Sequence, residues 1–363
     1  MRKILIFSFV LFAIMANAQK KADKLKLYGD VRFRTELDRN SKKNNGDMRA
    51  DRDRFRFRFR FGFKYALNEN IEFGGRIRSG NPDNAQSPHV TLGDEFNSKD
   101  LSIDKAYIKY TSNGFYIWGG KNSMNMWEPD EMLWDGDVNP EGIGLGNRFK
   151  LGDNAKLQLN GGYFILKNNT ITEGDVSKQT FGKHSNAAFA QAKFCTKLGD
   201  NKLIIAPGML QTYIHGMPWD YQIFSGFVQF KTKTGLNLHV DFFKNLADLK
   251  DKVDPNYEDQ TTGFAGTIGY NFSKKLSAKA SYAQIQKYAV IDMFAQDDWV
   301  RWGNAVMTRS SNFGGFGLAL KYKIAKNFNT QLKFWNVKGL AKPTGASDLE
   351  TGTRIRLDFN IKF

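Results

Sequence analysis

The chain has 363 residues, a formal net charge of +16, 14% aromatic residues and one cysteine. The lone Cys195 excludes an internal disulfide, and no stretch reaches the ~18 consecutive apolar residues that a membrane-spanning helix needs. A basic, aromatic-rich chain could bind nucleic acid, so the arrangement of charges and rings along the sequence must decide between function classes.

The N-terminus has the pattern of a secretory signal peptide. Two basic residues, Arg2 and Lys3, precede a short apolar run, and a small-x-small Ala-Asn-Ala triplet ends at residue 18. The next residue is glutamine and not cysteine, so no lipid anchor is indicated. We therefore predict a signal peptide over residues 1–18 and an exported chain over residues 19–363.

The segment 51–67 alternates arginine and phenylalanine almost without interruption. Successive side chains of a β-strand point to opposite faces, whereas a helix would mix them around its axis. In a strand, one face carries Arg52, Arg54, Arg56, Arg58, Arg60 and Lys64, and the other carries Phe55, Phe57, Phe59, Phe61, Phe63 and Tyr65. Rings toward lipid and arginines toward a water-filled lumen are typical of a transmembrane β-barrel. Because rings and charges are separated in an exported chain, we expect no nucleic-acid partner.

The rest of the chain continues the alternation of apolar and polar residues, and the predicted strands are joined alternately by short turns and by longer connections. The short turns are predicted near Asn68, Ser112, Gly152, Gly199, Thr234, Ser273 and Ala325. The longer connections are predicted at 38–50, 80–99, 128–141, 167–183, 216–220, 248–259, 293–309 and 340–349. This rhythm predicts an all-β fold, a transmembrane antiparallel up-and-down β-barrel of about 16 strands. Short turns and both termini would be periplasmic, and long loops such as 80–99 and 293–309 would be reachable from outside.

The last strand alternates apolar and polar residues and ends on Phe363. An alternating terminal strand that closes on an aromatic residue resembles the signal by which the outer-membrane assembly machinery recognises its substrates. We predict that Phe363 is such an assembly signal, and that the chain is located in the outer membrane of a Gram-negative bacterium.

Closing a barrel places the last strand beside the first, so arginines that are distant in sequence would gather on one wall. The predicted pore-lining basic residues are Arg32, Arg34, Arg54, Arg56, Arg58, Arg60, Arg76, Arg78, Arg148, Arg354 and Arg356. The carboxylates on the same strands are Asp30, Glu36, Glu72 and Asp358. Uncompensated positive charge in a low-dielectric passage attracts anions. The alternative is that these arginines only face water and pair with those carboxylates.

The third long connection is acidic. Its carboxylates are Glu128, Asp130, Glu131, Asp135, Asp137 and Glu141. An acidic loop that faced the basic wall would create a transverse field across the pore, and the alternative is a solvated surface loop. Asp135, Asp137 and Asn139 also have the alternating spacing of a calcium loop, but Pro140 occupies the glycine position and the final bidentate glutamate is missing.

Several segments of the first 40% or so of the chain resemble the putative porin family of Gram-negative outer membranes. They are Tyr28–Arg34, Arg54–Arg60, Ile103–Tyr107, Gly119–Lys121 and Leu133–Gly142. The resemblance implies a diffusion barrel that is often trimeric, and in porins the third loop commonly folds inward and narrows the pore. Phosphate-selective porins, which have arginine-lined pores, are a neighbouring group.

Signals for other chemistry are weak. The four histidines, His89, His184, His215 and His239, lack ligand spacing, so no metal site is predicted. The glycines at 142, 144 and 146 do not follow the dinucleotide fingerprint, and no nucleophile motif is present. We predict neither a cofactor nor an enzymatic activity.

The sequence thus predicts a porin for passive diffusion of small hydrophilic solutes, with a preference for anions. Its expected partners are outer-membrane lipid, small anionic or polar solutes and copies of itself, with a trimer favoured. The alternative is a non-enzymatic accessory barrel of a larger outer-membrane complex, with a plugged lumen and loops that bind partner proteins.

Overall fold

The computed structural model describes residues 24–168, 184–303 and 309–363, and the predicted signal peptide lies outside these ranges. The elements are β1 (Leu25–Arg39), β2 (Arg52–Ala66), β3 (Ile71–Ser79), β4 (Val90–Thr91), β5 (Leu101–Ser112), β6 (Phe115–Lys121), β7 (Glu141–Leu151), β8 (Ala155–Lys167), β9 (Ser185–Leu198), β10 (Asn201–Tyr213), β11 (Gln222–Lys231), β12 (Leu236–Asn245), the short 3-10 helix η3 (Pro255–Tyr257), β13 (Thr262–Asn271), β14 (Leu276–Ile285), β15 (Phe313–Ala325), β16 (Phe328–Gly339) and β17 (Thr351–Lys362).

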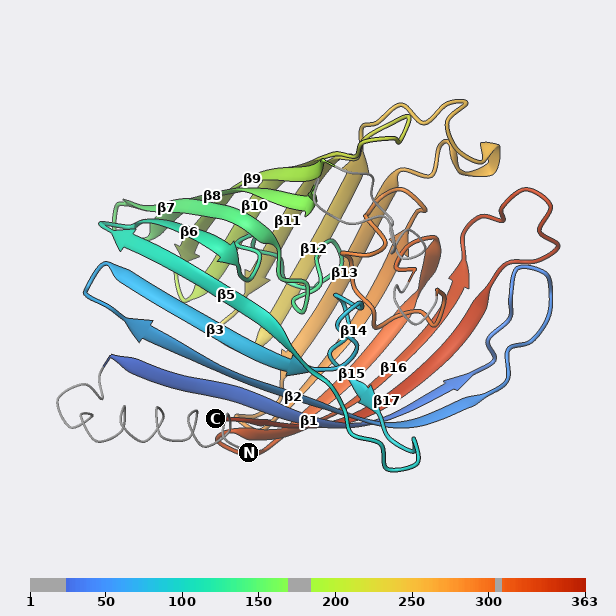
Figure 1. Cartoon of the computed structure of the whole chain (residues 1–363), viewed down its shortest axis with the longest axis horizontal. Helices are drawn as coiled ribbons and strands as arrows, with labels where there is room; N and C mark the ends of the chain where they lie inside the picture. The colour runs from blue at the N-terminus through green and yellow to red at the C-terminus, as the bar shows by residue number, and fades with distance from the viewer. Residues whose placement is uncertain (1–23, 169–183, 304–308) are drawn as a thin grey trace, which may run out of the picture.

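Every strand except the two-residue β4 belongs to one closed antiparallel barrel (Figure 1). Each of these strands pairs with its neighbours in chain order, and β1 pairs with β17 to close the cylinder. The predicted all-β antiparallel barrel of about 16 strands is therefore confirmed. The described part of the chain contains no helix with the length and hydropathy to span a bilayer.

The connections alternate between a short-turn end and a long-loop end, as the sequence predicts (Figure 1). All seven predicted turns fall between paired strands, for example residues 67–70 between β2 and β3. The predicted connection 167–183 falls almost entirely outside the described residues. The sequence did not predict β4, which pairs with Arg56 and Phe57 beyond the point where β3 stops pairing with β2.

The two faces of β2 differ in exposure as the alternation predicts. Arg56 and Arg58 are 8% and 6% exposed, whereas Phe55 is 65% exposed and Phe61 is 36% exposed. The arginine face therefore points into the barrel, and the ring face points outward. The same outward apolar surface continues around the other strands, as expected for a barrel in contact with lipid.

The C-terminal residue closes the seam between β17 and β1. The Phe363 amide donates to the Gly29 carbonyl at 3.1 Å, and the Gly29 amide donates to the Phe363 carbonyl at 3.0 Å. The Phe363 ring stacks with Phe61 at a centroid distance of 6.4 Å. Only glycine fits at position 29, because an added Cβ would lie 2.5 Å from both the Phe363 ring and the Arg60 carbonyl oxygen.

We expect deletion of Phe363 to reduce the amount of folded barrel in the outer membrane. The deletion removes both backbone bonds to Gly29, each worth about 0.5–1.5 kcal/mol, together with the ring stack on Phe61. The measurement is heat-modifiable mobility of the protein from membrane fractions. Phe359→Leu, which changes another outward ring of β17, is the control, and equal folded yield for the deletion and the control would contradict the prediction.

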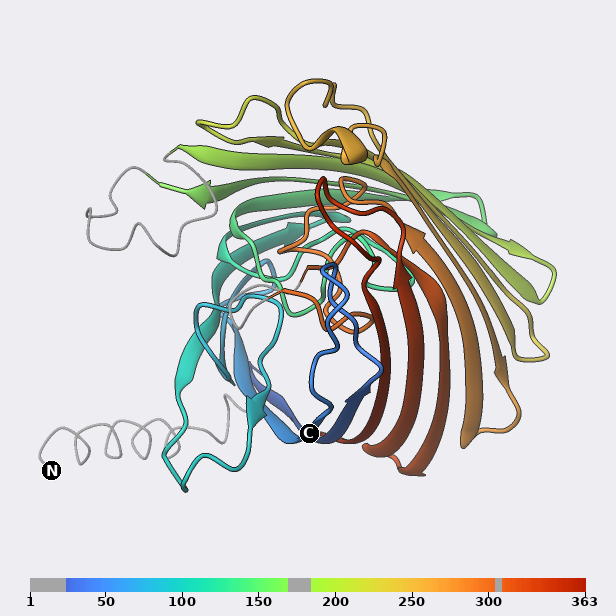
Figure 2. The ribbon, with the colours of Figure 1, turned by 90° about the vertical axis from the view of Figure 1, so that its right-hand side faces the viewer.

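The lumen is largely filled by three long connections that turn inward (Figure 2). They are residues 80–89 after β3, residues 122–140 between β6 and β7, and residues 286–303 between β14 and β15. Apolar side chains of the second and third connections join a buried cluster that includes Leu133, Trp134, Phe294, Trp299 and Trp302, whereas the buried side chains of the first connection are mainly polar. Both connections that were predicted to be reachable from outside, 80–99 and 293–309, therefore have a part that turns into the lumen, residues 80–89 and 293–303 respectively.

Candidate pore constriction

Ten of the predicted arginines gather on four adjacent strands. This basic wall, on β17, β1, β2 and β3, consists of Arg32, Arg34, Arg54, Arg56, Arg58, Arg60, Arg76, Arg78, Arg354 and Arg356. The strand register brings guanidinium groups side by side, because Arg34 lies opposite Arg56 and Arg32 lies opposite Arg58. These guanidinium groups can be buried because carboxylates and polar groups of the wall and the inward loops lie beside them.

Arg148 is separate from this wall, contrary to the prediction. It lies on β7 and lines an open cavity together with Lys150, Lys156 and Lys193. The prediction was wrong because periodicity assigns a face of a strand but does not assign a position around the barrel. Arg148 therefore provides a lumen-side arginine that is distant from the candidate constriction.

Glu36 of β1 is a carboxylate that four arginines share. Its carboxylate is fully buried and contacts Arg54, Arg356 at 2.5 Å, Arg56 at 3.7 Å and Arg52 at 3.8 Å. Asp38 also accepts from Arg52, and Asp298 accepts from Arg356, so three carboxylates serve these four guanidinium groups and that of Arg354, which shares Asp38. Positive charge therefore remains in excess around Glu36, in a place where protein surrounds it and the effective dielectric constant is low.

The other wall carboxylates pair more evenly. Asp358 accepts from Arg34 at 2.6 Å, and Asp38 accepts from Arg52 and Arg354, each at 2.7 Å. Both acids are buried in the wall. These two carboxylates allow neighbouring arginines of the wall to be buried together, because a buried guanidinium without a partner would carry a large desolvation cost.

The predicted list of wall carboxylates needs two corrections. Glu72 accepts from the Tyr107 hydroxyl at 2.9 Å instead of pairing with an arginine, while Asp104 of β5 pairs with Arg76 at 2.5 Å. The sequence count also omitted Asp38 and the carboxylates that loops bring in. The excess of positive charge is therefore smaller than predicted and is concentrated around Glu36.

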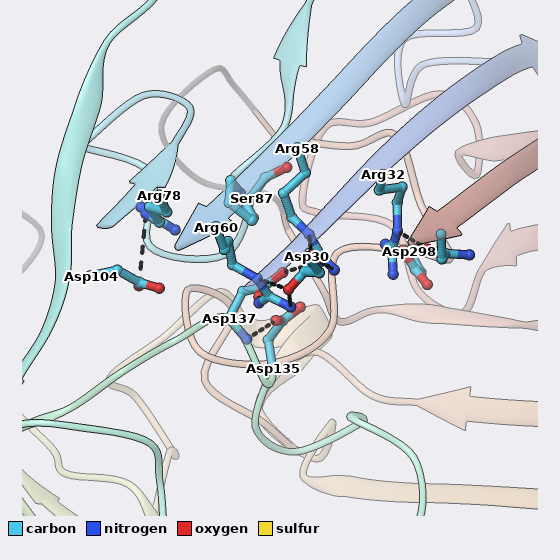
Figure 3. Close-up of polar contacts among 12 residues, drawn as sticks. Asp30, Arg32, Arg58, Arg60, Arg78, Ser87, Asp104, Asp135, Asp137 and Asp298 are labelled. Carbon is cyan, nitrogen blue, oxygen red and sulfur yellow. Dashed lines mark hydrogen bonds and ion pairs between the residues drawn. The ribbon is translucent and has the colours of Figure 1, made fainter. Parts of the chain in front are cut away.

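The acidic connection 122–140 reaches the basic wall through Asp137. This carboxylate accepts from Arg58 at 3.3 Å and from Arg60, and Asp30 of β1 accepts from the same two arginines (Figure 3). Burial raises the pKa of Asp137, but Arg58 and Arg60 more than offset this effect, so its pKa is lowered and it stays ionised.

The same connection also contacts the opposite side of the barrel. Asp130 lies 2.9 Å from the His239 ring Nε2 and accepts from Lys279 at 3.0 Å and from Thr267 at 3.1 Å. The His239 and Lys279 interactions lower the pKa of Asp130 against the opposing effect of burial. Because Asp137 contacts β2 and Asp130 contacts β12, β13 and β14, this loop spans the lumen.

Two of the six predicted loop acids do not face the passage. Glu128 is turned back into its own loop, where it accepts from the Leu133 and Trp134 amides, and burial raises its pKa well above the usual range. Glu141 belongs to the exposed start of β7 and pairs with Lys121 at 2.8 Å. Its assignment to the constriction is wrong, because the loop ends before it and strand alternation turns it outward.

Glu131 and Asp135 line a cavity of the lumen together with Asp137. The Glu131 side chain is accessible to solvent within the lumen, but desolvation by the surrounding protein, followed by the charges of Asp137 and Asp298, raises its pKa to about 7. Burial and the charge of Glu131 raise the pKa of Asp135 well above its usual range. The net charge of the loop therefore changes near neutral pH.

If this channel conducts, its preference for anions should rise as pH falls through about 7, because protonation of Glu131 removes a negative charge from the lumen. Above that pH the ionised Glu131 should weaken the preference. The measurement is reversal potential in a salt gradient at a series of pH values. Glu131→Gln should flatten the dependence, Glu141→Gln should leave it unchanged, and a pH profile that survives Glu131→Gln would contradict the assignment.

The connection 286–303 is a second constriction element that the sequence did not predict. Asp298 accepts from Arg356 and lies 3.4 Å from the Lys333 ammonium, while Arg354 donates to the Asp298 carbonyl at 2.9 Å. The feature of the sequence that could have revealed this element is the pair of adjacent aspartates at 297 and 298 within a run of aromatic residues, which are buried in the structure. A connection fully exposed to water would rarely carry so many large rings.

The inward loops hold one another in place. Trp134 stacks with Phe294 at a centroid distance of 4.8 Å, and the Asp135 amide donates to the Phe294 carbonyl at 2.6 Å. The Gln86 amide donates to the carbonyls of Asp292 and Ala295, each at 2.8 Å. Residues of three connections therefore form one packed unit inside the barrel.

Two cavities lie against the basic wall, and both reach Asp297. The turn-end cavity has a volume of about 340 Å³, and its lining includes Arg32, Arg60, Asp137 and Lys333. The loop-end cavity has a volume of about 430 Å³, and its lining is dominated by arginines. The region between them, where the loops meet the wall, is the candidate constriction.

The geometry gives no support for calcium at the acidic loop. The Asn139 side-chain amide donates to Asp104 at 2.7 Å, and the Asp137 amide donates to Asp135 at 2.8 Å. These groups therefore bind within the protein. Among the described residues, no group of three or more histidine, cysteine, aspartate or glutamate side chains is arranged to hold a metal ion.

Comparisons with known proteins agree with the barrel. Residues 45–205 match the model of a family described as "Putative porin". Similar solved structures are OprB of Pseudomonas putida (TM-score 0.60, 10% identity, 96% of each chain covered), the trimer form of OmpT of Vibrio cholerae (0.52, 10%, 93% of this chain and 99% of that chain) and the outer membrane channel DcaP of Acinetobacter baumannii (0.50, 14%, 93% and 97%).

No curated protein matches the chain. At identities of 10–14%, the likeness to the solved structures is a likeness of fold. The chain is thus a closed barrel with the fold of porins, and its resemblance to the putative porin family is confirmed over residues 45–205.

Proposed function

We propose that this chain is an outer-membrane porin through which small hydrophilic solutes diffuse passively, with a preference for anions. The family match and the porin-like barrels support an outer-membrane channel. The observation that carries the anion preference is the sharing of Glu36 by four guanidinium groups beside the candidate constriction. Excess positive charge in a narrow, low-dielectric passage concentrates anions and repels cations.

The inward loops would set the width of the passage and its transverse field. Asp137 and Asp298 contact arginines of the basic wall, whereas Asp130 contacts His239 and Lys279 on the other side of the lumen. Solutes would cross between these fixed charges at distances below the Debye length of about 8 Å, where salt screens incompletely. Selectivity would then depend on local residues more than on the net charge of the chain.

We assign the short-turn end to the periplasm, with both termini there, and the long-loop end to the cell exterior. This is the usual asymmetry of outer-membrane barrels. The outward rings would contact outer-membrane lipid. Association with copies of the chain, most simply as a trimer, is consistent with the trimer form of the similar OmpT.

The second candidate is an accessory barrel of a larger outer-membrane complex. The observation in its favour is the packing of three loops into the lumen, with Trp134, Phe294 and Trp302 buried. A barrel plugged in this way could present its outer loops to partner proteins without conducting.

Recording from the purified full chain in planar lipid bilayers separates the two candidates. The porin proposal predicts steady conductance steps in potassium chloride, since the two wall cavities would be joined by water. A correctly folded, heat-modifiable barrel that inserts without steady conductance would contradict the porin proposal and favour the accessory barrel.

A further inference from the structure

We propose that the loop-end cavity is a binding site for a small organic dianion, such as a dicarboxylate or a phosphate ester. This inference rests on the proposed function and names a class of solute for it. The cavity of about 430 Å³ lies between the basic wall and the connection 286–303. Its size falls within the usual range of about 300–1,000 Å³ for small-molecule sites.

The charges around the cavity do not balance. The guanidinium groups are those of Arg52, Arg54, Arg56, Arg301, Arg354 and Arg356, and the carboxylates beside them are Glu36, Asp38, Asp297 and Asp298. Even with every carboxylate ionised, two positive charges remain. A further lining residue, Arg49, pairs with Glu350 at 2.6 Å, and because Glu350 also accepts from Arg309, this carboxylate does not reduce the excess. An excess of two positive charges would be neutralised by a ligand that carries two negative charges.

Hydrogen-bond donors in this group lack partners. Within the described residues, the buried Nε–H groups of Arg54 and Arg56 have none, although Arg56 is only 8% exposed. Arg301 makes a hydrogen bond to the Ala50 carbonyl at 2.8 Å and has no carboxylate partner in the described part of the chain. Buried donors without acceptors are costly, and an oxyanion would satisfy them because the planar guanidinium fork matches carboxylate and phosphate oxygens.

The wall opposite the arginines is partly apolar. Val300 and Trp302 line the cavity from the connection 286–303, while Asn84 and Ser87 add uncharged polar groups. A ligand whose two acidic groups are joined by a carbon skeleton fills more of this cavity of about 430 Å³ than a single inorganic oxyanion does, so the site should favour an organic dianion over an inorganic one.

Isothermal titration calorimetry of the detergent-purified full chain tests the site directly. The probes are glutarate and glycerol 3-phosphate, with sulfate as a dianion that lacks a carbon skeleton and butyrate as a monoanion. We expect at least one organic dianion to bind about tenfold more tightly than either sulfate or butyrate, and the better probe identifies the acidic group. An affinity for sulfate equal to that of both organic probes would overturn the proposal.

Two substitutions localise the binding. Arg301→Gln removes an arginine that makes no ion pair in the described part of the chain, so the barrel should fold, and it should weaken binding at least fivefold. Arg148→Gln removes a lumen-side arginine outside the cavity and should leave binding unchanged. Equal weakening by both substitutions would show diffuse attraction by net charge and would overturn the proposal.

The failure of this inference is distinguishable from the failure of the proposed function. Chloride-preferring conductance without saturable binding would overturn the site and leave the porin proposal intact. Saturable binding to a barrel that does not conduct would uphold the site and overturn passive transport through it.

Discussion

Replacing Arg54 and Arg56 with glutamine should remove most of the preference for anions while the barrel still folds. Both side chains face the lumen beside Glu36, and Arg356 and Arg52 remain to pair with that carboxylate in the double variant. Fields of this kind change local ion concentrations by tenfold or more. We therefore expect the ratio of chloride to potassium permeability to fall on the order of tenfold.

The choice of these two positions follows from the contacts. Removing Arg58 and Arg60 would leave the partly buried Asp30 and Asp137 without their guanidinium partners, which would destabilise the fold as well as change the charge. Glutamine preserves much of the length of arginine and leaves the outward rings of β2 unchanged.

The matched control neutralises Arg148 and Lys150, two exposed basic residues of β7 that lie away from the basic wall. If local charge sets selectivity, this control should change the reversal potential little. High salt should reduce the difference between the wild type and the Arg54/Arg56 variant, because the Debye length shortens to about 3 Å at 1 M. Equal effects of the two double variants would show that the wall is not the selective element.

Phe294→Ala should increase conductance and make the current noisier. The Phe294 ring stacks on Trp134 and belongs to the buried cluster that joins the inward loops. Truncation of a buried phenylalanine costs about 3–5 kcal/mol. That cost falls on the contact between the two loops and not on the backbone pairing of the barrel, so the loops should open while the strands remain closed.

Single-channel amplitude and folded yield measure this effect together. Phe264→Ala is the control, because that ring lies on the outer face of β13 at 40% exposure and touches no part of the loop cluster. A Phe294→Ala channel with unchanged amplitude and noise would mean that the loop contact does not gate the passage.

The barrel could be predicted from the sequence because its signals are local. Alternation in β2 assigns Phe55 and Arg56 to opposite faces, and polar residues such as Asn68 terminate strands, so neighbouring residues suffice for both inferences. Strand order in an up-and-down barrel then follows chain order. The pairing of β1 with β17 required only that the barrel close.

The candidate site was less predictable because it depends on contacts across the lumen. No local pattern indicates that Asp298 meets Arg356, since these residues come together only after residues 286–303 fold inward. The sharing of Glu36 depends on strand register, which places Arg54 and Arg356 on either side of it. Arg148 and Glu141 were misplaced for related reasons, since alternation does not give the position of a strand around the barrel or the end of a loop.

Reversal potential of the wild-type channel in a tenfold potassium chloride gradient tests the central proposal most directly. The measurement needs no variant and depends only on which ion crosses more readily. The excess of guanidinium groups around Glu36 predicts a potential displaced from zero toward the chloride equilibrium value, with a smaller displacement at high salt. A potential at zero, or one displaced toward the potassium equilibrium value, would contradict it.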